Sequence, residues 1–297
     1  MKLSDFFNLI RYKNLILIAY LLLLIHFVFL PSFDVEPKLN TYQFLCLFFS
    51  ILFISSAGYI INDIFDVKVD LINKPKKVIV SKKIAIEKAK VYYRNINSIG
   101  LFLGIVLSIG TQNPSYSFVF ICASFSLYWY SKYLKSKPFI GNFMVSLLTA
   151  ITIPITLLFD IDSFNYNEPY IILLLITLFA FVLSLIREII KDIEDVNGDK
   201  KLLMNTLPII AGRKRAKFLV IILLFICIFS IAYLSISYAA DFKYAILYLI
   251  VTVFIPLTII AFKLLSLKNY SKIHIYSTAI KIIMFMGINS ILILAFA

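Results

Sequence analysis

Two clusters of acidic side chains are the parts of this sequence whose residue types and spacing could do chemistry. Residues 62–70 read NDIFDVKVD, and residues 187–200 read REIIKDIEDVNGDK. Steps of three and four residues return to the same side of an α-helix, so each cluster predicts a row of oxygen atoms along one helix face. The side chains in the two predicted rows are Asn62, Asp66 and Asp70, with Asp63 beside them, and Glu188, Asp192, Asp195 and Asp199.

The ligand that these rows predict is a hard divalent cation. Carboxylate and amide oxygens without histidine or cysteine favour Mg²⁺ ahead of Ca²⁺, and Mg²⁺ commonly keeps positions for water and for the phosphate oxygens of a substrate. A single carboxylate near a membrane is equally well explained by a lysine that neutralises it at a solvated surface. Two clusters of matching pattern favour the cation, because like charges one turn apart repel and need an opposite charge nearby. The predicted chemistry is therefore the binding of a diphosphate through bridging Mg²⁺.

The elements that must carry the clusters are predicted to be membrane-spanning helices. The chain has 297 residues, of which 61% are hydrophobic and 15% are charged, and its mean hydropathy is +0.94. This composition excludes an ordinary soluble domain. Apolar stretches long enough to cross about 30 Å of hydrocarbon recur along the whole chain. The nine predicted spans are residues 14–31, 42–61, 89–110, 116–132, 140–159, 170–189, 217–238, 243–262 and 276–296.

The strongly basic loops all fall on one side of the membrane when these nine spans alternate in direction, and the opposite side holds only Lys38 and Lys243 beside several acids. The positive-inside rule then places the N-terminus in the cytoplasm, the C-terminus outside and both acidic clusters at the cytoplasmic face. The net charge of +13 belongs to these loops, where lipid and topology explain it, so no nucleic-acid partner is predicted. The predicted fold is all-α, a polytopic membrane protein with one transmembrane domain over 1–297 and acidic motif loops at 62–88 and 187–216.

Basic and aromatic side chains near the clusters are candidate partners of the same diphosphate. Lys77 follows the first cluster, and Arg187 begins the second. Taken one at a time, such basic residues are better explained by loop topology, whereas anchoring at the membrane interface explains the residues of the fourth span about as well as a substrate does. The candidate pairs near the end of the fourth span are Tyr128 with Lys132 and, as an alternative, Tyr130 with Lys135.

The two clusters resemble the motifs of the UbiA superfamily of intramembrane prenyltransferases, whose members carry NDxxDxxxD after the second span and DxxxD after the sixth. Residues 62–70 match the first motif at every position, and Asp195 and Asp199 match the second, with Asp192 as an additional acid. The resemblance covers nearly the whole chain. Residues 187–212 look most like the branch that makes digeranylgeranylglyceryl phosphate.

Shorter stretches also resemble the family, with two departures. The family commonly carries Arg-Pro and Ser-Gly after its NxP turn, where this chain has Lys77-Val78 and Ser81-Lys82. These differences concern the phosphate-binding loop and leave the metal motifs intact. The shorter matches are RYKN at 11–14, similar to an early RPxN, NKP at 73–75 and GN at 141–142.

The resemblance implies nine helices around a central cavity and an enzyme of the cell membrane with its active site facing the cytoplasm. It implies Mg²⁺-dependent transfer of a prenyl group from an allylic prenyl diphosphate to a lipophilic acceptor. In the branch named above, that acceptor is the hydroxyl group of geranylgeranylglyceryl phosphate or a related lipid. The implied metal ligands are Asn62, Asp66, Asp70, Asp192, Asp195 and Asp199. The implied partners of the diphosphate are Asn14, Lys77, Tyr128, Lys132 and Arg187. The residues expected to act in catalysis are Asp63, Asp66, Asp195 and Lys132.

Three other functions fit parts of the same pattern. An aromatic quinone precursor, such as 4-hydroxybenzoate or dihydroxynaphthoate, is an alternative prenyl acceptor. A cation-coupled transporter would use the carboxylates as an ion path, but it favours acids at mid-membrane depth, whereas these acids cluster at one face. A soluble prenyl diphosphate synthase or terpene cyclase also uses paired acidic helices, and the nine predicted spans argue against it.

Overall fold

The computed structural model describes residues 3–161, 168–238 and 240–296. These residues form helices and turns, with one isolated bridge between Val80 and Ile84 and no strand. Their contacts define two compact units, each made of segments that are not contiguous in sequence. Unit 1 comprises Met1–Leu22, Pro37–Ser136 and Thr152–Ser163, and unit 2 comprises Leu23–Glu36, Lys137–Ile151 and Phe164–Ala297. The single domain over 1–297 stays a prediction.

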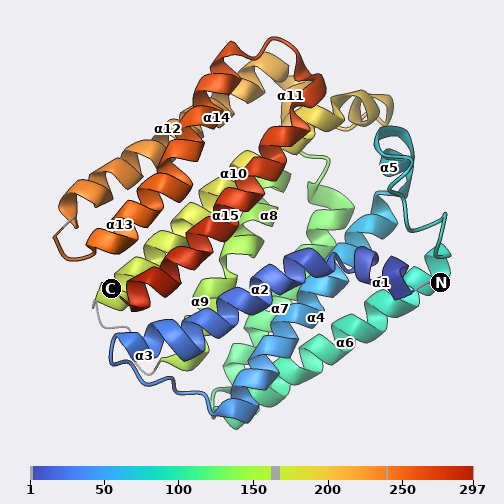
Figure 1. Ribbon diagram of the computed structural model, residues 1–297. Coiled ribbons are helices and arrows are strands. Elements are labelled where there is room, and N and C mark those ends of the chain that lie inside the picture. Colours follow the sequence, from blue (N-terminus) through green and yellow to red (C-terminus); the bar gives the residue numbers. More distant parts are fainter. Residues whose placement is uncertain (1–2, 162–167, 239, 297) are drawn as a thin grey trace. The chain divides into compact units, whose positions relative to one another are not determined.

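Both units consist of helices joined by short connections (Figure 1). The helices of unit 1, which include most of α2, are α1 (Leu3–Leu9), α2 (Tyr12–Leu24), α4 (Thr41–Phe65), α5 (Val67–Asn73), α6 (Ile86–Gly110), the 3₁₀ turn η2 (Pro114–Tyr116), α7 (Ser117–Trp129), the π-helix η3 (Tyr130–Leu134) and α9 (Thr152–Asp160). The helices of unit 2 are the π-helix η1 (Ile25–Phe29), α3 (Leu30–Ser32), α8 (Ile140–Ala150), α10 (Glu168–Lys201), α11 (Leu207–Ile210), α12 (Arg213–Ser237), α13 (Lys243–Leu249), the π-helix η4 (Ile250–Phe254), α14 (Ile255–Ser266), the 3₁₀ turn η5 (Tyr270–Lys272) and α15 (His274–Ala295).

Helix α4, which carries Asn62 and Asp63 of the first acidic cluster, begins with a capping box. The Asn40 side chain accepts from the Gln43 backbone N–H at 3.0 Å, and the Gln43 side chain accepts from the Asn40 N–H at 3.1 Å. These two bonds satisfy backbone donors that a helix start leaves without partners. They fix where α4 begins, and with it the register of the acids at its far end.

Helices α4, α6 and α7 lie side by side (Figure 1), and small residues are found where they meet. The Ser50 hydroxyl of α4 donates to the Gly100 carbonyl of α6 at 2.7 Å, which requires close approach of the two helices. Further along α6, Gly104 lies against the ring of Phe120 in α7. Small residues at such contacts are typical of helices that associate within a membrane.

Replacing Gly104 with alanine is expected to lower the free energy of unfolding by about 1–3 kcal/mol, the usual cost of overpacking. A Cβ atom there would lie 2.5 Å from ring carbons of Phe120, which is itself buried. Thermal unfolding in detergent measures the loss. Gly110→Ala, at the end of the same helix, is the control, since a Cβ at Gly110 meets nothing within 4 Å. Equal melting temperatures for the two variants would contradict this account of the α6–α7 contact.

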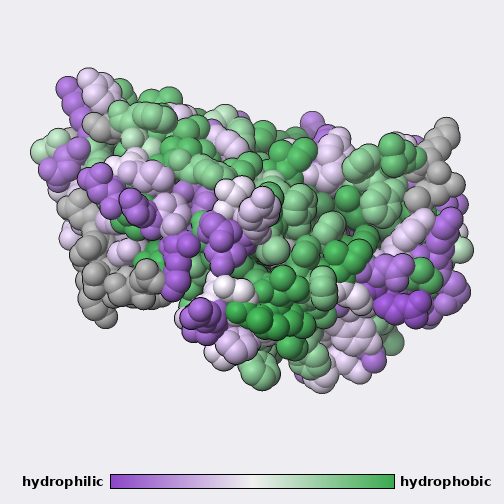
Figure 2. Space-filling view, turned by 90° about the horizontal axis from the view of Figure 1, so that it is seen from below, coloured by the Kyte–Doolittle hydropathy of each residue, from purple (hydrophilic) through white to green (hydrophobic). Residues whose placement is uncertain are grey.

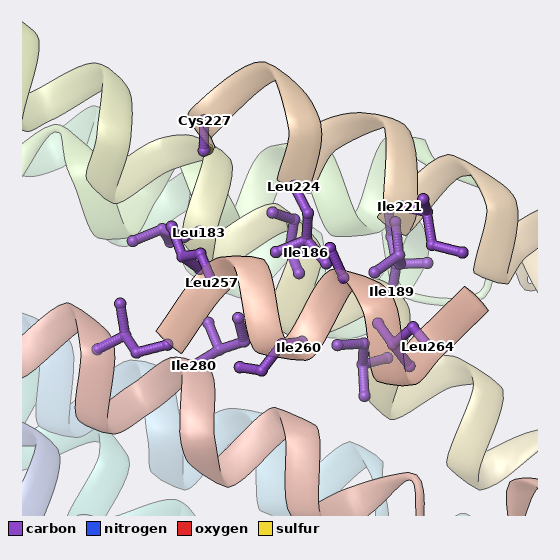
Figure 3. Close-up of a cluster of buried hydrophobic side chains, with 14 of the residues drawn as sticks. Leu183, Ile186, Ile189, Ile221, Leu224, Cys227, Leu257, Ile260, Leu264 and Ile280 are labelled. Carbon is purple, nitrogen blue, oxygen red and sulfur yellow. The ribbon is translucent and has the colours of Figure 1, made fainter. Parts of the chain in front are cut away.

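Unit 2 has a hydrophobic core built by four of its long helices, with isoleucine and leucine side chains that point toward one another (Figure 3). Burial of this apolar surface is the main source of stability for the helix that carries the second acidic cluster. Core residues drawn in Figure 3 include Leu183, Ile186 and Ile189 of α10, Leu224 of α12, Leu257 of α14 and Ile280 of α15.

Large hydrophobic side chains also cover much of the outside of the molecule. Figure 2 shows them spread over one face, and Phe102, Phe229 and Ile236 are among the most exposed. Exposed apolar surface of this extent is typical of helices that face lipid. Together with the long apolar helices, it confirms the predicted multi-pass membrane protein.

Seven of the described helical segments are long and apolar enough to cross a membrane. The predicted spans 89–110 and 116–132 are not among them. Helix α6 contains the polar residues Arg94, Asn95 and Asn97, and the segment of α7 and η3 ends in the sequence LYWYSKYL. These polar side chains lower the hydropathy of both segments, so the count of nine spans stays a prediction. The seven are Tyr12–Ser32, Thr41–Phe65, Ile140–Asp160, Pro169–Lys201, Arg213–Ser237, Lys243–Ser266 and Tyr270–Ala295.

The structure differs from the sequence analysis in the regions named as acidic motif loops. Helix α10 continues to Lys201, well beyond the predicted end at residue 189, so the first half of 187–216 is helical. The first motif likewise lies on the end of α4 and on α5, and only residues after Asn73 form turns. Loss of hydrophobicity marks where a helix leaves the membrane and does not by itself end the helix.

Candidate active site

The first acidic cluster surrounds the junction between α4 and α5. Asp66 is the C-cap residue of α4 and the N-cap of α5, and its backbone N–H donates to the Asn62 carbonyl at 2.9 Å. The Asn62 side-chain amide donates to Asp66 Oδ2 at 2.6 Å. Asp66 is only 5% exposed. This carboxylate is therefore fixed in place at the end of the helix, as its predicted role as a metal ligand requires.

A lysine ammonium contacts this buried carboxylate. Lys135 Nζ donates to Asp66 Oδ2 and lies 3.5 Å from Asn62 Oδ1. Burial of the ammonium opposes its charge, but the Asp66 carboxylate, with Tyr130 and Asp70, outweighs burial and raises the pKa of Lys135 above its ordinary value. Lys135 thus stays protonated and supplies one positive charge between two predicted metal ligands.

A second cation neutralises the neighbouring acid of the motif. Arg11 Nη2 donates to Asp63 Oδ1 at 3.0 Å, and the guanidinium lies 5.0 Å from the centre of the Tyr59 ring. Asn14, one turn into α2, donates through its side-chain amide to the Tyr59 hydroxyl at 3.3 Å. Arg11 has φ of 53° at the corner between α1 and α2, a left-handed conformation that a non-glycine residue rarely adopts. The Arg-Asn stretch at 11–14 therefore packs directly against the first acidic motif.

Replacing Arg11 with alanine is expected to destabilise the protein by about 1–3 kcal/mol, because the largely buried Asp63 carboxylate loses its charged partner. Arg11→Lys should recover part of the loss, since an ammonium keeps the charge but does not stack on Tyr59 as a guanidinium does. Thermal unfolding of both variants in detergent measures the effect, with the exposed Arg94→Ala as control. Adding Asp63→Asn to Arg11→Ala should restore stability, and purely additive losses would rule the ion pair out as the cause.

The nearby charges also change the pKa of Asp70 in α5. Burial and the nearby Asp66 carboxylate raise the pKa of Asp70 to about 6, although Lys135 acts in the opposite direction. A carboxyl group with a raised pKa is a place where a further cation would be favourable. Asp70 is thus a third carboxyl group of this cluster, beside the two that pair with Arg11 and Lys135.

The second acidic cluster lies along the last turns of α10. Asn142 of α8, the Asn of the GN match, is buried and donates its side-chain amide to Asp192 Oδ2 at 2.8 Å. Asp199 is 4% exposed, and the Thr206 hydroxyl lies 3.4 Å from its Oδ2. Asp195, which lies between these two acids in the sequence, is half-buried. Helix α8 and the segment after α10 thus orient two of the three acids of this second cluster that are predicted to bind metal.

Glu188 and its neighbours form a smaller ion-pair group at the start of the second cluster. Glu188 Oε1 accepts from Arg187 Nη1 at 2.9 Å and from Lys191 Nζ at 2.7 Å. Within the described part of the chain, the Arg187 Nε atom is buried and has no hydrogen-bond partner. A buried N–H without an acceptor is unfavourable, and an anionic oxygen would satisfy it. Arg187 accordingly fits its predicted role as a partner of the diphosphate.

The remaining predicted partners of the diphosphate lie in more open positions. Lys132 is exposed, and its ammonium lies over the rings of Tyr128, at 5.6 Å, and Tyr133, at 4.8 Å. The Tyr128 ring in turn contacts the edge of the Phe65 ring. Lys77 is exposed in the turn after α5. The roles of Lys77, Tyr128 and Lys132 toward a substrate stay predictions, and the contact with the acidic motif is made by Lys135.

The donor atoms of each acidic cluster fit Mg²⁺ in their chemistry. Among the described residues, no group of three or more His, Cys, Asp or Glu side chains lies close enough together to hold a metal. The two acidic clusters belong to different units. Their side chains offer only oxygen atoms, which suit a hard cation, and a lysine ammonium already lies on the Asp66 carboxylate. Water and phosphate oxygens would complete the coordination of Mg²⁺ held by so few protein ligands.

Sequence reasoning missed the contacts that hold the acids in place. It named Lys135 only as part of an alternative pair, and it gave Arg11 and Asn142 no role. The sequence feature that could have pointed to Arg11 and Asn142 is their position in the short RYKN and GN matches to the family. Their partners are 52 and 50 residues away in sequence, beyond the reach of helical spacing.

Similarity to known proteins identifies the family of this chain. The UbiA prenyltransferase family model matches residues 22–286. Digeranylgeranylglyceryl phosphate synthase from Saccharolobus solfataricus is 37% identical over 214 residues, which is 70% of each chain. The protein of the same name from Methanosphaera stadtmanae is 32% identical over 273 residues, covering 91% of this chain and 90% of that one.

Solved structures share the fold along nearly the whole chain. A structure concerned with digeranylgeranylglyceryl phosphate synthase in membranes has a TM-score of 0.66 at 26% identity, covering 99% of this chain and 98% of its own. A UbiA homologue from Archaeoglobus fulgidus bound to GPP and Mg²⁺ has a TM-score of 0.67 at 18% identity, and the match covers 99% of this chain and 100% of that one. The second likeness concerns the fold alone. This chain belongs to the UbiA prenyltransferase family and is a prenyltransferase, as its two acidic motifs predicted.

Proposed function

We propose that this enzyme transfers a prenyl group from an allylic prenyl diphosphate to the free hydroxyl group of geranylgeranylglyceryl phosphate or a closely related lipid. The observation that carries the proposal is its identity of 32% over 91% of the chain with a digeranylgeranylglyceryl phosphate synthase. The acidic motifs account for use of a diphosphate with either class of acceptor. The relatives are what favour the glyceryl phosphate over an aromatic ring.

In the proposed reaction the bond between the allylic carbon and the diphosphate oxygen breaks. The acceptor hydroxyl oxygen bonds to that carbon, and the hydroxyl proton and diphosphate are released. Negative charge accumulates on the leaving diphosphate, and Mg²⁺ held by the aspartate clusters would neutralise it. Charge developing on the leaving group is where fixed positive groups stabilise the transition state most.

Residues of both acidic clusters have defined parts in this proposal. Asn62, Asp66 and Asp70 of the first cluster would offer oxygen atoms to Mg²⁺, and so would Asp192, Asp195 and Asp199 of the second. Arg187 Nε, buried without an acceptor among the described residues, donates to the diphosphate. Asp63 stays neutralised by Arg11 and maintains the geometry of the cluster.

The proposed topology has nine spans, with the N-terminus and the active site at the cytoplasmic side of the cell membrane. Helix α6 and the segment of α7 and η3 would be the two spans beyond the seven that their length and composition identify. The support for this orientation is the sorting of lysine and arginine among the loops.

A panel of acceptors tests the proposed function. Purified protein in lipid nanodiscs is incubated with radiolabelled geranylgeranyl diphosphate and Mg²⁺, together with geranylgeranylglyceryl phosphate, 4-hydroxybenzoate or dihydroxynaphthoate. We expect a product one prenyl group heavier than geranylgeranylglyceryl phosphate, detected by mass spectrometry. The matched control acceptor has its free hydroxyl methylated and should give no product.

Two results would overturn the proposal. One is prenylation of an aromatic acceptor with none of the glyceryl phosphate. The other is product from the methylated control, because that acceptor has no hydroxyl group to attack the allylic carbon.

A further inference from the structure

Lys135 lies where the sequence analysis expects a metal ion. Its ammonium contacts the Asp66 carboxylate and lies 3.5 Å from Asn62 Oδ1. Both oxygen-bearing side chains are predicted metal ligands. Asp66 is almost completely buried, so a charge on this carboxylate needs a cation whenever no metal is bound. Lys135 supplies that charge.

The backbone places Lys135 here through a break in helix geometry. After α7 the chain forms the π-helix η3, and the Lys135 N–H donates to the Tyr130 carbonyl, five residues earlier, at 3.0 Å. The wider turn shifts the side chains that follow around the helix axis. Lys132 is therefore left exposed over the rings of Tyr128 and Tyr133, while Lys135 points at the acidic motif. Single π turns inside α-helices occur frequently at functional sites.

The two cations of this cluster differ in how readily they can move. Arg11 is held by its bond to Asp63 and by the Tyr59 ring. Lys135 is held through a single ammonium at the end of a flexible four-carbon side chain. A compact ammonium on such a stem can move between two anions more easily than a stacked guanidinium. Asp63 thus has a fixed cation and Asp66 an exchangeable one.

We infer that Lys135 acts as a resident cation: it neutralises Asp66 when no metal is bound, and leaves this carboxylate for the prenyl diphosphate when metal and diphosphate bind together. The inference rests on the proposed function for the identity of the metal and the diphosphate. Without diphosphate, the ammonium competes with the metal for Asp66 and weakens metal binding. With diphosphate, the ammonium has another anion to contact, so the competition ends and the two ligands bind cooperatively.

Metal binding by purified protein in detergent tests the inference, with Mn²⁺ as a spectroscopic probe for Mg²⁺ and inorganic diphosphate as the anion. Lys135→Gln is expected to bind Mn²⁺ alone on the order of tenfold more tightly than the unmodified protein. Addition of diphosphate should tighten Mn²⁺ binding strongly in the unmodified protein and much less in the variant. Lys137→Gln, an exposed lysine of the same connection, is the matched control and should behave as the unmodified protein does.

A second variant keeps the test decisive if Lys135→Gln does not fold. Lys135→Arg retains the charge in a group that can form two hydrogen bonds to the carboxylate and leaves it less readily. It should bind Mn²⁺ alone several-fold more weakly than the unmodified protein. Equal or weaker metal binding by Lys135→Gln, or equal or tighter binding by Lys135→Arg, would overturn the inference.

The inference and the proposed function fail in different ways. Prenyl transfer to the glyceryl phosphate, together with unchanged metal affinity in Lys135→Gln, rejects the resident cation and leaves the function intact. Tighter Mn²⁺ binding by Lys135→Gln, without transfer to any glyceryl phosphate, supports the resident cation and rejects the proposed acceptor.

Discussion

Replacing Asp66 with asparagine is expected to reduce kcat for prenyl transfer by on the order of 100- to 1000-fold at saturating donor and Mg²⁺. Asparagine has the shape of aspartate, so the packing around this buried position changes little. The substitution removes the negative charge that holds the metal beside the leaving diphosphate. Because that charge acts on the leaving group, the loss should appear mainly in kcat.

The measurement is the initial rate of radiolabel transfer, accompanied by thermal unfolding to show that the variant is folded. Asp195→Asn tests the second cluster in the same way and should lose activity to a similar degree. Glu87→Gln is the control, since this side chain is 82% exposed and forms an ion pair with Lys90, one turn away. Near-normal kcat in both Asp66→Asn and Asp195→Asn would falsify the metal assignment.

Removal of the metal is the second change with a large expected effect. Dialysis against a chelator should abolish prenyl transfer, and Mg²⁺ should restore it. Mn²⁺ is expected to restore part of the activity, because it also accepts oxygen ligands. Zn²⁺ is expected to fail, since the two acidic clusters contain no histidine or cysteine and Zn²⁺ sites in proteins use mainly these ligands.

The same dialysis should leave the protein folded. Arg11 already neutralises Asp63, and Lys135 already neutralises Asp66, so the first cluster does not need a metal to avoid an unpaired buried charge. The melting temperature in detergent should therefore change little on chelation while activity is lost. Activity that persists in excess chelator would contradict the metal requirement, and unfolding on chelation would assign the metal a structural role instead.

The site was predictable as far as helical spacing reaches. Asn62, Asp66 and Asp70 follow one another at intervals of four residues, and the last turns of α10 carry Asp192, Asp195 and Asp199 at intervals of three and four. Such spacing depends only on the number of residues per turn, which is common to all α-helices. The choice of oxygen ligands follows from those rows, and the family and reaction class follow from the resemblance of the two motifs to those of the UbiA superfamily.

The partner of each acid was not predictable in this way. Arg11 reaches Asp63 across 52 residues, and Asn142 reaches Asp192 across 50. Which side chains meet over such separations depends on how helices pack, and no local pattern encodes it. The choice between Lys132 and Lys135 has a local cause, because the π-helix at Tyr130–Leu134 changes the direction of the side chains from that of a regular α-helix.

Composition and periodicity were thus sufficient to identify a helical membrane protein with two acidic rows. Contact with lipid requires long apolar stretches, and the number of residues per turn fixes the spacing of side chains on one face, so both can be read from the sequence. Tertiary packing was needed to show that Asp63 pairs with Arg11 and that Asp66 pairs with Lys135. The physical reason is that charges in a low-dielectric site must be neutralised by groups brought close in space, and closeness in space is decided by the packing of helices that are distant in sequence.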